Sequence, residues 1–408
     1  MDKEIKERIA AINSGIIPEG YKKTKVGIVP VEWEVERFDK IATKFDYGFN
    51  AAAKAFDGEN KYIRITDIDE GSNKYSFSDI VSPDCELDED YLVEENDILF
   101  ARTGASTGKT YLYNQDDGKM FFAGFLIRAN INIQNNAYFI FSQTLTERYA
   151  NWVRIFSMRS GQPGINAQEY KSFEILLPPL PEQQKIAEIL STQDKLIELQ
   201  EKKIEQLKEM KKAYLQKMFP QKGSKYPELR FKGFTEAWEQ RKLIEIVKSI
   251  DTGKSKFQSD SDNGEFAILG STSIIGYDDS YDYDGDFILT ARVGANAGSL
   301  YRYTGKAKIS DNTVFIQTEK NIEFVYYMLT KFDIKQLSFG TGQPLVKASE
   351  LKNLDLKMPS QIEEQQKIGS FFSQLDSLIT LHQRKSEQEK QKKKALMQLL
   401  LTGIVRTK

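Results

Sequence analysis

Residues 181–218 read PEQQKIAEILSTQDKLIELQEKKIEQLKEMKKAYLQKM. From residue 182 onward this run contains neither glycine nor proline, whereas prolines stand just before it and again at position 220. Its apolar residues recur in alternating steps of four and three, which is the spacing of a coiled-coil seam. The run therefore predicts one helix of about 55 Å, at about 1.5 Å per residue. Its apolar seam positions are Ile186, Leu190, Ile197, Ile204, Leu207 and Tyr214.

A second run near the C-terminal end repeats the first one. EEQQKIGSFF at 363–372 matches PEQQKIAEIL at 181–190, and KKALMQL at 393–399 matches KKAYLQK at 211–217, with the same offset for both matches. A helix with one apolar stripe is unstable alone in water, so the natural partner of each helix is its duplicate. We therefore predict that the two helices pair antiparallel as a coiled coil. The apolar seam positions of the second copy are Ile368, Phe372, Leu375, Ile379, Leu396 and Leu400, and the middle of this seam is polar.

The segments in front of the two helices are copies of each other as well. ARTGASTGKTYLY at 101–113 matches ARVGANAGSLYRY at 291–303, and SGQPGINAQEYK at 160–171 matches TGQPLVKASELK at 341–352. VEWEV and EAWEQ, around Trp33 and Trp238, open the two copies. Blocks in the same order with drifting offsets indicate one duplicated unit with insertions and deletions in its loops.

Each copy mixes short apolar runs with glycine, asparagine and aspartate, which predicts strands and turns with a few helices. The predicted fold class is therefore α+β. It consists of two similar α+β domains, called heads below, separated by the two long antiparallel helices and related by a pseudo-twofold axis. The predicted divisions are an N-terminal helical segment at 1–20, the first head at 21–180, the central long helix at 181–222, the second head at 223–360 and the C-terminal long helix at 361–408.

The composition argues against several classes of function. Cys85 and His382 are the single cysteine and the single histidine, so a disulfide within the chain and a Cys/His zinc site are excluded. We expect no catalytic triad and no metal site. No run of about 18 apolar residues could span a membrane, and the N-terminus lacks a signal peptide. The chain is therefore expected to be cytoplasmic. Its net charge of -2 is unusual for a nucleic-acid-binding protein, so any DNA-binding surface needs its basic residues clustered on one face.

Two short motifs are similar to those of enzymes but depart from them. GASTGKT at 104–110 places its first glycine one residue too close to the second for a P-loop, and the duplicate GANAGSL lacks the Lys-Thr pair. A structural turn is therefore favoured over nucleotide binding. LPPL at 177–180 lacks the Asn or Asp that precedes the two prolines in adenine methyltransferases. Methyl transfer, if it occurs, must come from another chain.

Hydrogen-bond donors gather in the two duplicated loops, where they suit contacts with phosphates or base edges. Arg102 and Arg292 occupy equivalent positions, so a structural role stays open for both, because residues that read sequence should differ between the heads. Gln162 and Gln343 could pair with adenine or simply shape turns. The candidate DNA contacts are Arg102, Thr103, Ser106, Lys109, Arg154, Arg159, Gln162, Asn166, Lys254, Lys256, Arg292, Asn296, Gln343 and Lys347.

Two different heads on a stiff spacer suit the reading of two half-sites at a fixed separation on duplex DNA. At this level of detail the chain resembles the specificity subunits of type I restriction–modification enzymes. VEWEV and EAWEQ, SGQPGIN and TGQPLVK, LPPLPEQQKIAEIL and IEEQQKIGSFF, and the closing KKALMQLLLTG carry the resemblance, which spans nearly the whole chain. The second helix departs from the pattern, because MPSQI stands where the first has PPL.

The resemblance implies a non-catalytic subunit with two target-recognition domains, which binds a bipartite, asymmetric site on double-stranded DNA. It also implies two methyltransferase subunits docked on the helices, and restriction subunits that join through the complex. No cofactor is expected on this chain, whereas S-adenosylmethionine, ATP and Mg are expected on the partner subunits. Two alternatives stay open: an orphan or phase-variable subunit that serves methylation only, and a coiled-coil scaffold whose heads bind protein. An autonomous nuclease is disfavoured because catalytic motifs are absent.

Overall fold

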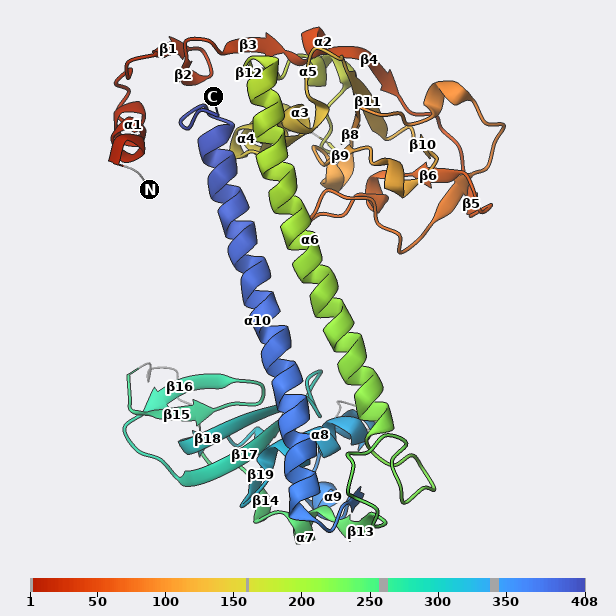
Figure 1. Cartoon of the computed structure of the whole chain (residues 1–408), viewed down its shortest axis with the longest axis vertical. Coiled ribbons are helices and arrows are strands. Elements are labelled where there is room, and N and C mark those ends of the chain that lie inside the picture. Colours follow the sequence, from red (N-terminus) through yellow and green to blue (C-terminus); the bar gives the residue numbers. More distant parts are fainter. Residues whose placement is uncertain (1–2, 159–160, 257–262, 338–344, 408) are drawn as a thin grey trace. The chain divides into compact units, whose positions relative to one another are not determined.

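The computed structural model describes residues 3–158, 161–256, 263–337 and 345–407. The chain forms two compact units, the first built from residues 1–199 with 386–408, and the second from residues 200–385. Each unit therefore contains one head and one part of both long helices (Figure 1).

The two predicted long helices are present as α6 (Leu180–Lys217) and α10 (Ile362–Leu400). Pro181 stands in the first turn of α6, where a missing backbone N–H leaves no hydrogen bond unmade. The helix ends before Pro220, whose ring cannot continue it. Among the described residues, no helix combines the length and the apolar character that crossing a bilayer requires.

Within each unit the two long helices pack against each other antiparallel. In the first unit Gln193 donates to the backbone oxygen of Glu389 at 3.4 Å, and in the second unit Gln200 pairs with His382 at 2.7 Å. Most of the seam residues named from the sequence are buried, and Ile204, Tyr214 and Leu396 are partly buried. Buried or half-buried polar pairs replace apolar contacts in the middle of the seam, which explains why α10 continues through its polar stretch.

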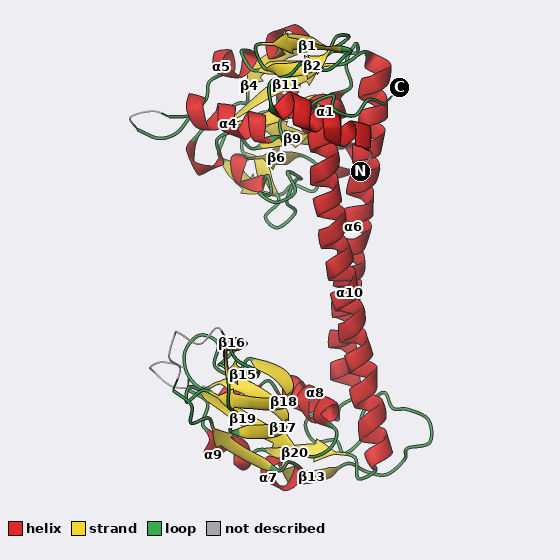
Figure 2. Cartoon of the chain, turned by 90° about the vertical axis from the view of Figure 1, so that its left-hand side faces the viewer, coloured by secondary structure: helices red, strands yellow, loops and turns green. Residues whose placement is uncertain are grey.

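The first head is built on an antiparallel sheet of strand order β4-β11-β8-β9, with two-stranded ribbons around it (Figure 2). Helix α1 (Lys3–Asn13) precedes the head and has no buried residue. The strands are β1 (Tyr21–Thr24), β2 (Gly27–Pro30), β3 (Glu34–Arg37), β4 (Ala42–Tyr47), β5 (Ala53–Ala55), β6 (Lys61–Ile63), β7 (Val81–Pro83), β8 (Asp97–Ala101), β9 (Thr110–Leu112), β10 (Met120–Phe122), β11 (Leu126–Ile131) and β12 (Glu174–Leu177). The helices are α2 (Phe38–Ile41), α3 (Ala137–Gln143), α4 (Glu147–Phe156) and α5 (Ala167–Lys171).

The second head has a six-stranded sheet of order β14-β19-β17-β18-β15-β16. Its strands are β13 (Glu239–Lys242), β14 (Ser249–Thr252), β15 (Phe266–Leu269), β16 (Ile274–Asp278), β17 (Tyr283–Ala291), β18 (Leu300–Ile309), β19 (Thr313–Thr318) and β20 (Asp355–Met358). Its helices are α7 (Leu243–Ile246), α8 (Ile322–Phe332) and α9 (Ala348–Lys352).

The duplication seen in the sequence is repeated in the folds of the heads. The order β4-β11-β8-β9 in the first head corresponds to β14-β19-β17-β18 in the second, and the ribbon β3-β12 corresponds to β13-β20. Trp33 and Trp238, which open the two copies, are both fully buried in the cores that join each head to the long helices. The α+β prediction with two similar domains is therefore confirmed.

Candidate nucleic-acid interface

In the first head, the two duplicated loop motifs lie side by side although they are far apart in the chain. The backbone N–H of Ile165 donates to the backbone oxygen of Arg102 at 2.9 Å, and that of Gly104 donates to Pro163 at 3.0 Å. Gly104 has a positive φ of 71°, and a Cβ there would lie 3.1 Å from the side-chain nitrogen of Gln162. The loop pair therefore brings Arg102, Thr103 and Gln162 together.

The second head repeats this contact. The backbone N–H of Val346 donates to the backbone oxygen of Arg292 at 2.8 Å, and Val293 forms a β-bridge with Leu345. Two of the predicted contacts, Gln343 in this head and Arg159 in the first, lie outside the described residues. Both heads thus present an arginine at the junction of the two motifs that the duplication preserved.

The two equivalent arginines have different surroundings. Arg102 donates from Nε to the backbone oxygen of Gly124 at 2.9 Å, and its guanidinium lies 5.1 Å from the ring centre of Tyr47 and 5.8 Å from that of Phe125. Arg292 is exposed, and its side chain has no hydrogen bond or ion pair with any other described residue. Part of Arg102 is therefore used to hold its own head together, whereas the Arg292 guanidinium can be offered to a ligand.

The neighbours of these arginines account for the difference. The backbone N–H of Arg102 donates to the backbone oxygen of Phe125, and that of Arg292 donates to the backbone oxygen of Asn312. Asn312 therefore occupies the place that an aromatic residue has in the first head. Lys254 and Lys256 are exposed and flank Ser255. The backbone N–H of Ser255 donates to the backbone oxygen of Ile309, and its backbone oxygen accepts from the backbone N–H of Asp311. The chain therefore brings Lys254, Lys256 and Arg292 to the same edge of the second head.

Several other candidates already have partners within the protein. Lys109 pairs with Glu70 at 2.8 Å, and Lys347 pairs with Glu350 at 3.5 Å. The side-chain oxygen of Asn166 accepts from the N–H of Glu169 and so caps α5. Ser106 is half-buried, and Arg154 and Asn296 are exposed. DNA contact by each of these residues stays a prediction.

Exposed apolar residues also lie beside the loop pair of the first head, and they are not among the candidates predicted from the sequence. At the end of α4, next to Arg154, Ile155 is 62% exposed and Met158 is 73% exposed. Phe125 beside Arg102 is 53% exposed. Such side chains can contact thymine methyl groups or wedge between base steps. The available signal was the position of apolar residues immediately before the SGQP motif.

The duplicated EQQ motif fastens each head to the helix pair. Glu182 accepts from Trp33 Nε1 at 3.1 Å and from Arg406 at 2.7 and 2.8 Å, and this hydrogen bonding raises the pKa of Arg406 above its usual range. Glu364 accepts from Arg230 at 2.7 and 2.8 Å. Both carboxylates are buried, so these pairs satisfy charges that would otherwise be costly.

The glutamines of the same motif bind the heads directly. Gln183 donates to Asn135 at 3.1 Å, and Gln365 accepts from Asn321 at 3.1 Å. The EQQ motif, which is one of the sequences that carry the family resemblance, therefore attaches each head to its long helix.

The long helices also carry exposed leucines that the seam does not use. Leu196 and Leu199 on α6 are 40% and 62% exposed, and Leu378 and Leu381 on α10 are 44% and 45% exposed. The two pairs occupy equivalent positions when the EQQKI blocks of the helices are aligned, so they are products of the duplication. We call these four residues the outer leucines.

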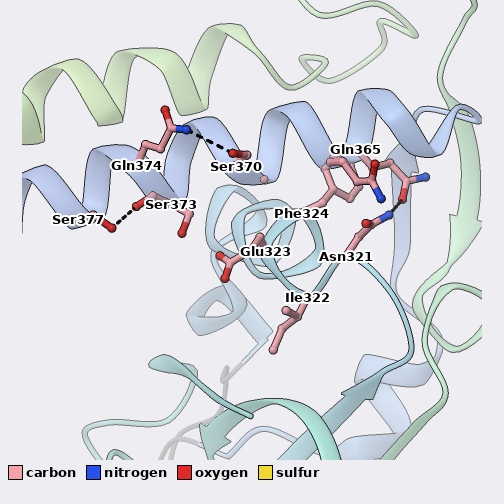
Figure 3. A pocket seen from close by; sticks show the side chains of 11 residues that line it. Asn321, Ile322, Glu323, Phe324, Gln365, Ser370, Ser373, Gln374 and Ser377 are labelled. Carbon is pink, nitrogen blue, oxygen red and sulfur yellow. Dashed lines mark hydrogen bonds between the residues drawn. The ribbon is translucent and has the colours of Figure 1, made fainter.

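A shallow groove of about 340 Å³ lies between α8 and α10 in the second unit (Figure 3). Its lining includes Gly369, Ser370 and Ser373, and some of its polar groups bond one another, as in the bond from Ser377 to the backbone oxygen of Ser373 at 2.9 Å. In the described part of the chain, no three His, Cys, Asp or Glu side chains gather where they could hold a metal ion. The one carboxylate in the described lining of the groove, that of Glu323, is paired with Arg302.

Comparisons with known sequences bear directly on these features. The family described as "Type I restriction modification DNA specificity domain" matches residues 30–209 and 235–391. The type I restriction enzyme MjaVIII specificity subunit of Methanocaldococcus jannaschii is 26% identical over 96% of this chain and 97% of its own length. The EcoprrI specificity subunit of Escherichia coli is 29% identical over 28% of each chain.

Solved structures share the fold. The S subunit of a type I system from M. genitalium superposes with a TM-score of 0.65 at 15% identity, covering 90% of this chain and 96% of that one. A chain from a structure on complex assembly and conformational transition of the type I R-M system gives 0.54 at 16% identity, covering 92% and 99%. Because the matched sequence regions contain most of both heads and most of both long helices, the chain belongs to the family of type I restriction–modification specificity subunits, which recognise DNA.

Proposed function

We propose that this specificity subunit reads a split, asymmetric DNA site, with one half-site bound by each head. The observation that carries the proposal is the repeated junction of the two loop motifs, which presents Arg102 in one head and Arg292 in the other. A duplicated reader predicts two half-sites, and the number of base pairs between them follows from geometry.

The surroundings of the two junctions differ between the heads, which supports an asymmetric site. Gly48 and Gly253 occupy equivalent places, since a Cβ on either would lie 2.3 Å from a backbone oxygen of the neighbouring strand segment. The residues before them are Tyr47 and Thr252, and these differ as much as Phe125 and Asn312 do. Because side chains that meet base edges determine which bases are preferred, the two heads are expected to prefer different sequences.

Arg292→Lys is expected to relax base selection in the second half-site. Lysine keeps the charge but lacks the planar fork that bonds guanine at two points, so discrimination should fall by about 10- to 100-fold at one position. The measurement is the methylated sequence mapped after co-expression with the partner methyltransferase. Lys256→Gln is the matched control, since loss of a phosphate contact should weaken binding without changing the preferred bases. If the Arg292→Lys variant keeps the original base selectivity, Arg292 contacts the phosphate backbone of the DNA and not a base edge.

Methyltransferase subunits are proposed to dock on the outer leucines. Exposed apolar residues repeated on both helices suit two copies of one partner, and the similar proteins named above are subunits of multi-chain restriction enzymes. S-adenosylmethionine, ATP and Mg²⁺ are proposed to bind those partner chains, and this chain then contributes recognition and assembly without bond chemistry.

Replacing either leucine pair by lysine is expected to remove one methyltransferase subunit from the complex. Leu378→Lys with Leu381→Lys should weaken one docking site by about 2–4 kcal/mol, because charged side chains would have to be buried in an apolar contact. Leu196→Lys with Leu199→Lys should do the same at the other site. Native mass spectrometry counts the subunits. Gln383→Lys is the control, since it is exposed and lies about 200° around α10 from Leu381. Full assembly of the four-lysine variant would refute the docking surface.

Co-expression with the methyltransferase, followed by mapping of methylated adenines, tests the proposal as a whole. A motif in two parts with a fixed gap is the expected result, and one continuous motif would contradict it. The alternative of a protein-binding scaffold predicts no salt-dependent binding to duplex DNA, whereas a reader that contacts phosphates loses affinity steeply as salt rises. Copurification of a restriction subunit separates a full restriction system from a subunit that serves methylation only.

A further inference from the structure

A tyrosine, an aspartate and a lysine from three different elements meet in the first unit. Tyr138 on α3 donates its hydroxyl hydrogen to Asp194 on α6, and Nζ of Lys393 on α10 lies 2.5 Å from the other oxygen of the same carboxylate. Helix α3 belongs to the first head, whereas α6 and α10 are the long helices. One carboxylate therefore joins the head to its own helix and to the opposite helix.

The second unit contains the same combination. Tyr327 on α8 donates to Asp376 on α10 at 2.6 Å, and Nζ of Lys211 on α6 lies 2.6 Å from the second carboxylate oxygen. The Lys211 ammonium also lies 5.3 Å from the ring centre of Tyr327. The roles of the two long helices are exchanged, as an internal twofold relationship requires. The aspartate and lysine side chains of both triads are 18–30% exposed, so the charges are largely shielded from water.

The tyrosines show that this arrangement is more than a remnant of duplication. The aspartates and the lysines occupy equivalent positions in the two aligned helix sequences. The tyrosines are not equivalent, because Tyr138 stands two residues after the N-cap Asn136, whereas Tyr327 stands six residues after the N-cap Asn321. Two different positions on the head helices therefore supply the same hydroxyl to the same carboxylate.

We infer that the two Tyr–Asp–Lys triads are positioning devices, which hold each head at one angle on the helix pair and thereby fix the gap between the half-sites. The inference rests on the proposed reading of a split site. A carboxylate bonded from a head on one side and from the opposite helix on the other resists tilting of the head and sliding of the helices together. In the part of the chain that the structure describes, no hydrogen bond or ion pair joins a triad residue to the junctions around Arg102 and Arg292. The triads therefore act on where a head reads and not on which bases it prefers.

Tyr138→Phe and Tyr327→Phe test the inference in the full chain, co-expressed with the methyltransferase. The substrates are DNA sites whose gap is native, or one or two base pairs shorter or longer. Each substitution removes one hydroxyl and keeps the packed ring. Selection against a gap that is wrong by one base pair should fall by about tenfold, the scale of one charge-assisted hydrogen bond, while both half-site sequences stay unchanged. Lys393→Gln and Lys211→Gln attack the same carboxylates from the other side and should give the same change.

The matched control is Tyr111→Phe, which removes a buried hydroxyl that donates to Asp117 inside the first head at 2.6 Å. It should lower the thermal stability of the protein and leave gap selection intact. Unaltered gap selection in all four triad variants would overturn the inference. A continuous methylated motif from the unmodified chain would instead overturn the proposed split site, so the two failures are distinguishable.

Discussion

A heptad added to both long helices is expected to lengthen the gap in the methylated site by about three base pairs. The insertion duplicates residues 197–203 of α6 and residues 379–385 of α10, which lie at the same level because Gln200 pairs with His382. Seven residues add about 10 Å of helix and keep the seam on the same face. DNA rises about 3.4 Å per base pair, which gives the expected change. The methylated adenines in co-expressing cells provide the measurement.

An insertion in α6 alone is the matched control for the heptad experiment. It shifts the seam of one helix past the other, so apolar positions lose their partners and the protein should be destabilised or insoluble. The double insertion should fold, because every seam residue finds an equivalent neighbour. If the double insertion folds and methylates the original site with its original gap, the helices do not determine the separation of the half-sites.

Glu364→Gln is expected to destabilise the second unit by about 3–5 kcal/mol, because it leaves the largely buried guanidinium of Arg230 without its counter-charge. The Glu364 side chain is only 1% exposed and that of Arg230 is 14% exposed, so water cannot replace the lost carboxylate. For a unit of this size the loss corresponds to a decrease in Tm of roughly 10 °C. Thermal unfolding followed by circular dichroism is the measurement.

Two further variants separate the ion pair from general effects at the start of α10. Glu363→Gln changes the exposed neighbour of Glu364 and should alter the stability by less than about 0.5 kcal/mol. Glu364→Leu combined with Arg230→Met removes both charges and should recover much of the loss, since no buried charge stays unpaired. A double variant no more stable than Glu364→Gln would show that the pair contributes more than mutual neutralisation.

Features that repeat along the chain could be predicted from the sequence. The period of the apolar residues in 182–218 and its copy predicted α6 and α10, and the ordered blocks predicted two similar heads. The middle of the second seam is polar, and the structure buries Ser386 on α10 and Gln193 on α6 there. Hydrogen bonds join the two helices in this stretch, whereas apolar packing joins them elsewhere. A pattern of apolar residues cannot predict such hydrogen bonds.

The candidate site was harder to predict because its chemistry depends on contacts between distant residues. Arg102 and Arg292 occupy the same position in their motifs, but their neighbours differ. Phe125 lies beside Arg102 and Asn312 lies beside Arg292, and both neighbours stand outside the matching blocks of sequence. The junction of each loop pair likewise joins segments that are far apart in the sequence. The outer leucines lie outside the one apolar stripe that forms the seam of each helix, so the period of the seam does not predict them.

The distribution of the units along the chain has a consequence for synthesis. The second unit is continuous from residue 200 to residue 385, whereas the first needs residues 386–408. Leu400 and Leu401 lie in the core of the first head, and Arg406 neutralises Glu182. During synthesis, all residues of the second unit therefore emerge from the ribosome before the last residues of the first unit, which complete its core. The part made first should finish folding last, and until then its buried carboxylate and apolar surface are open to chaperones and proteases.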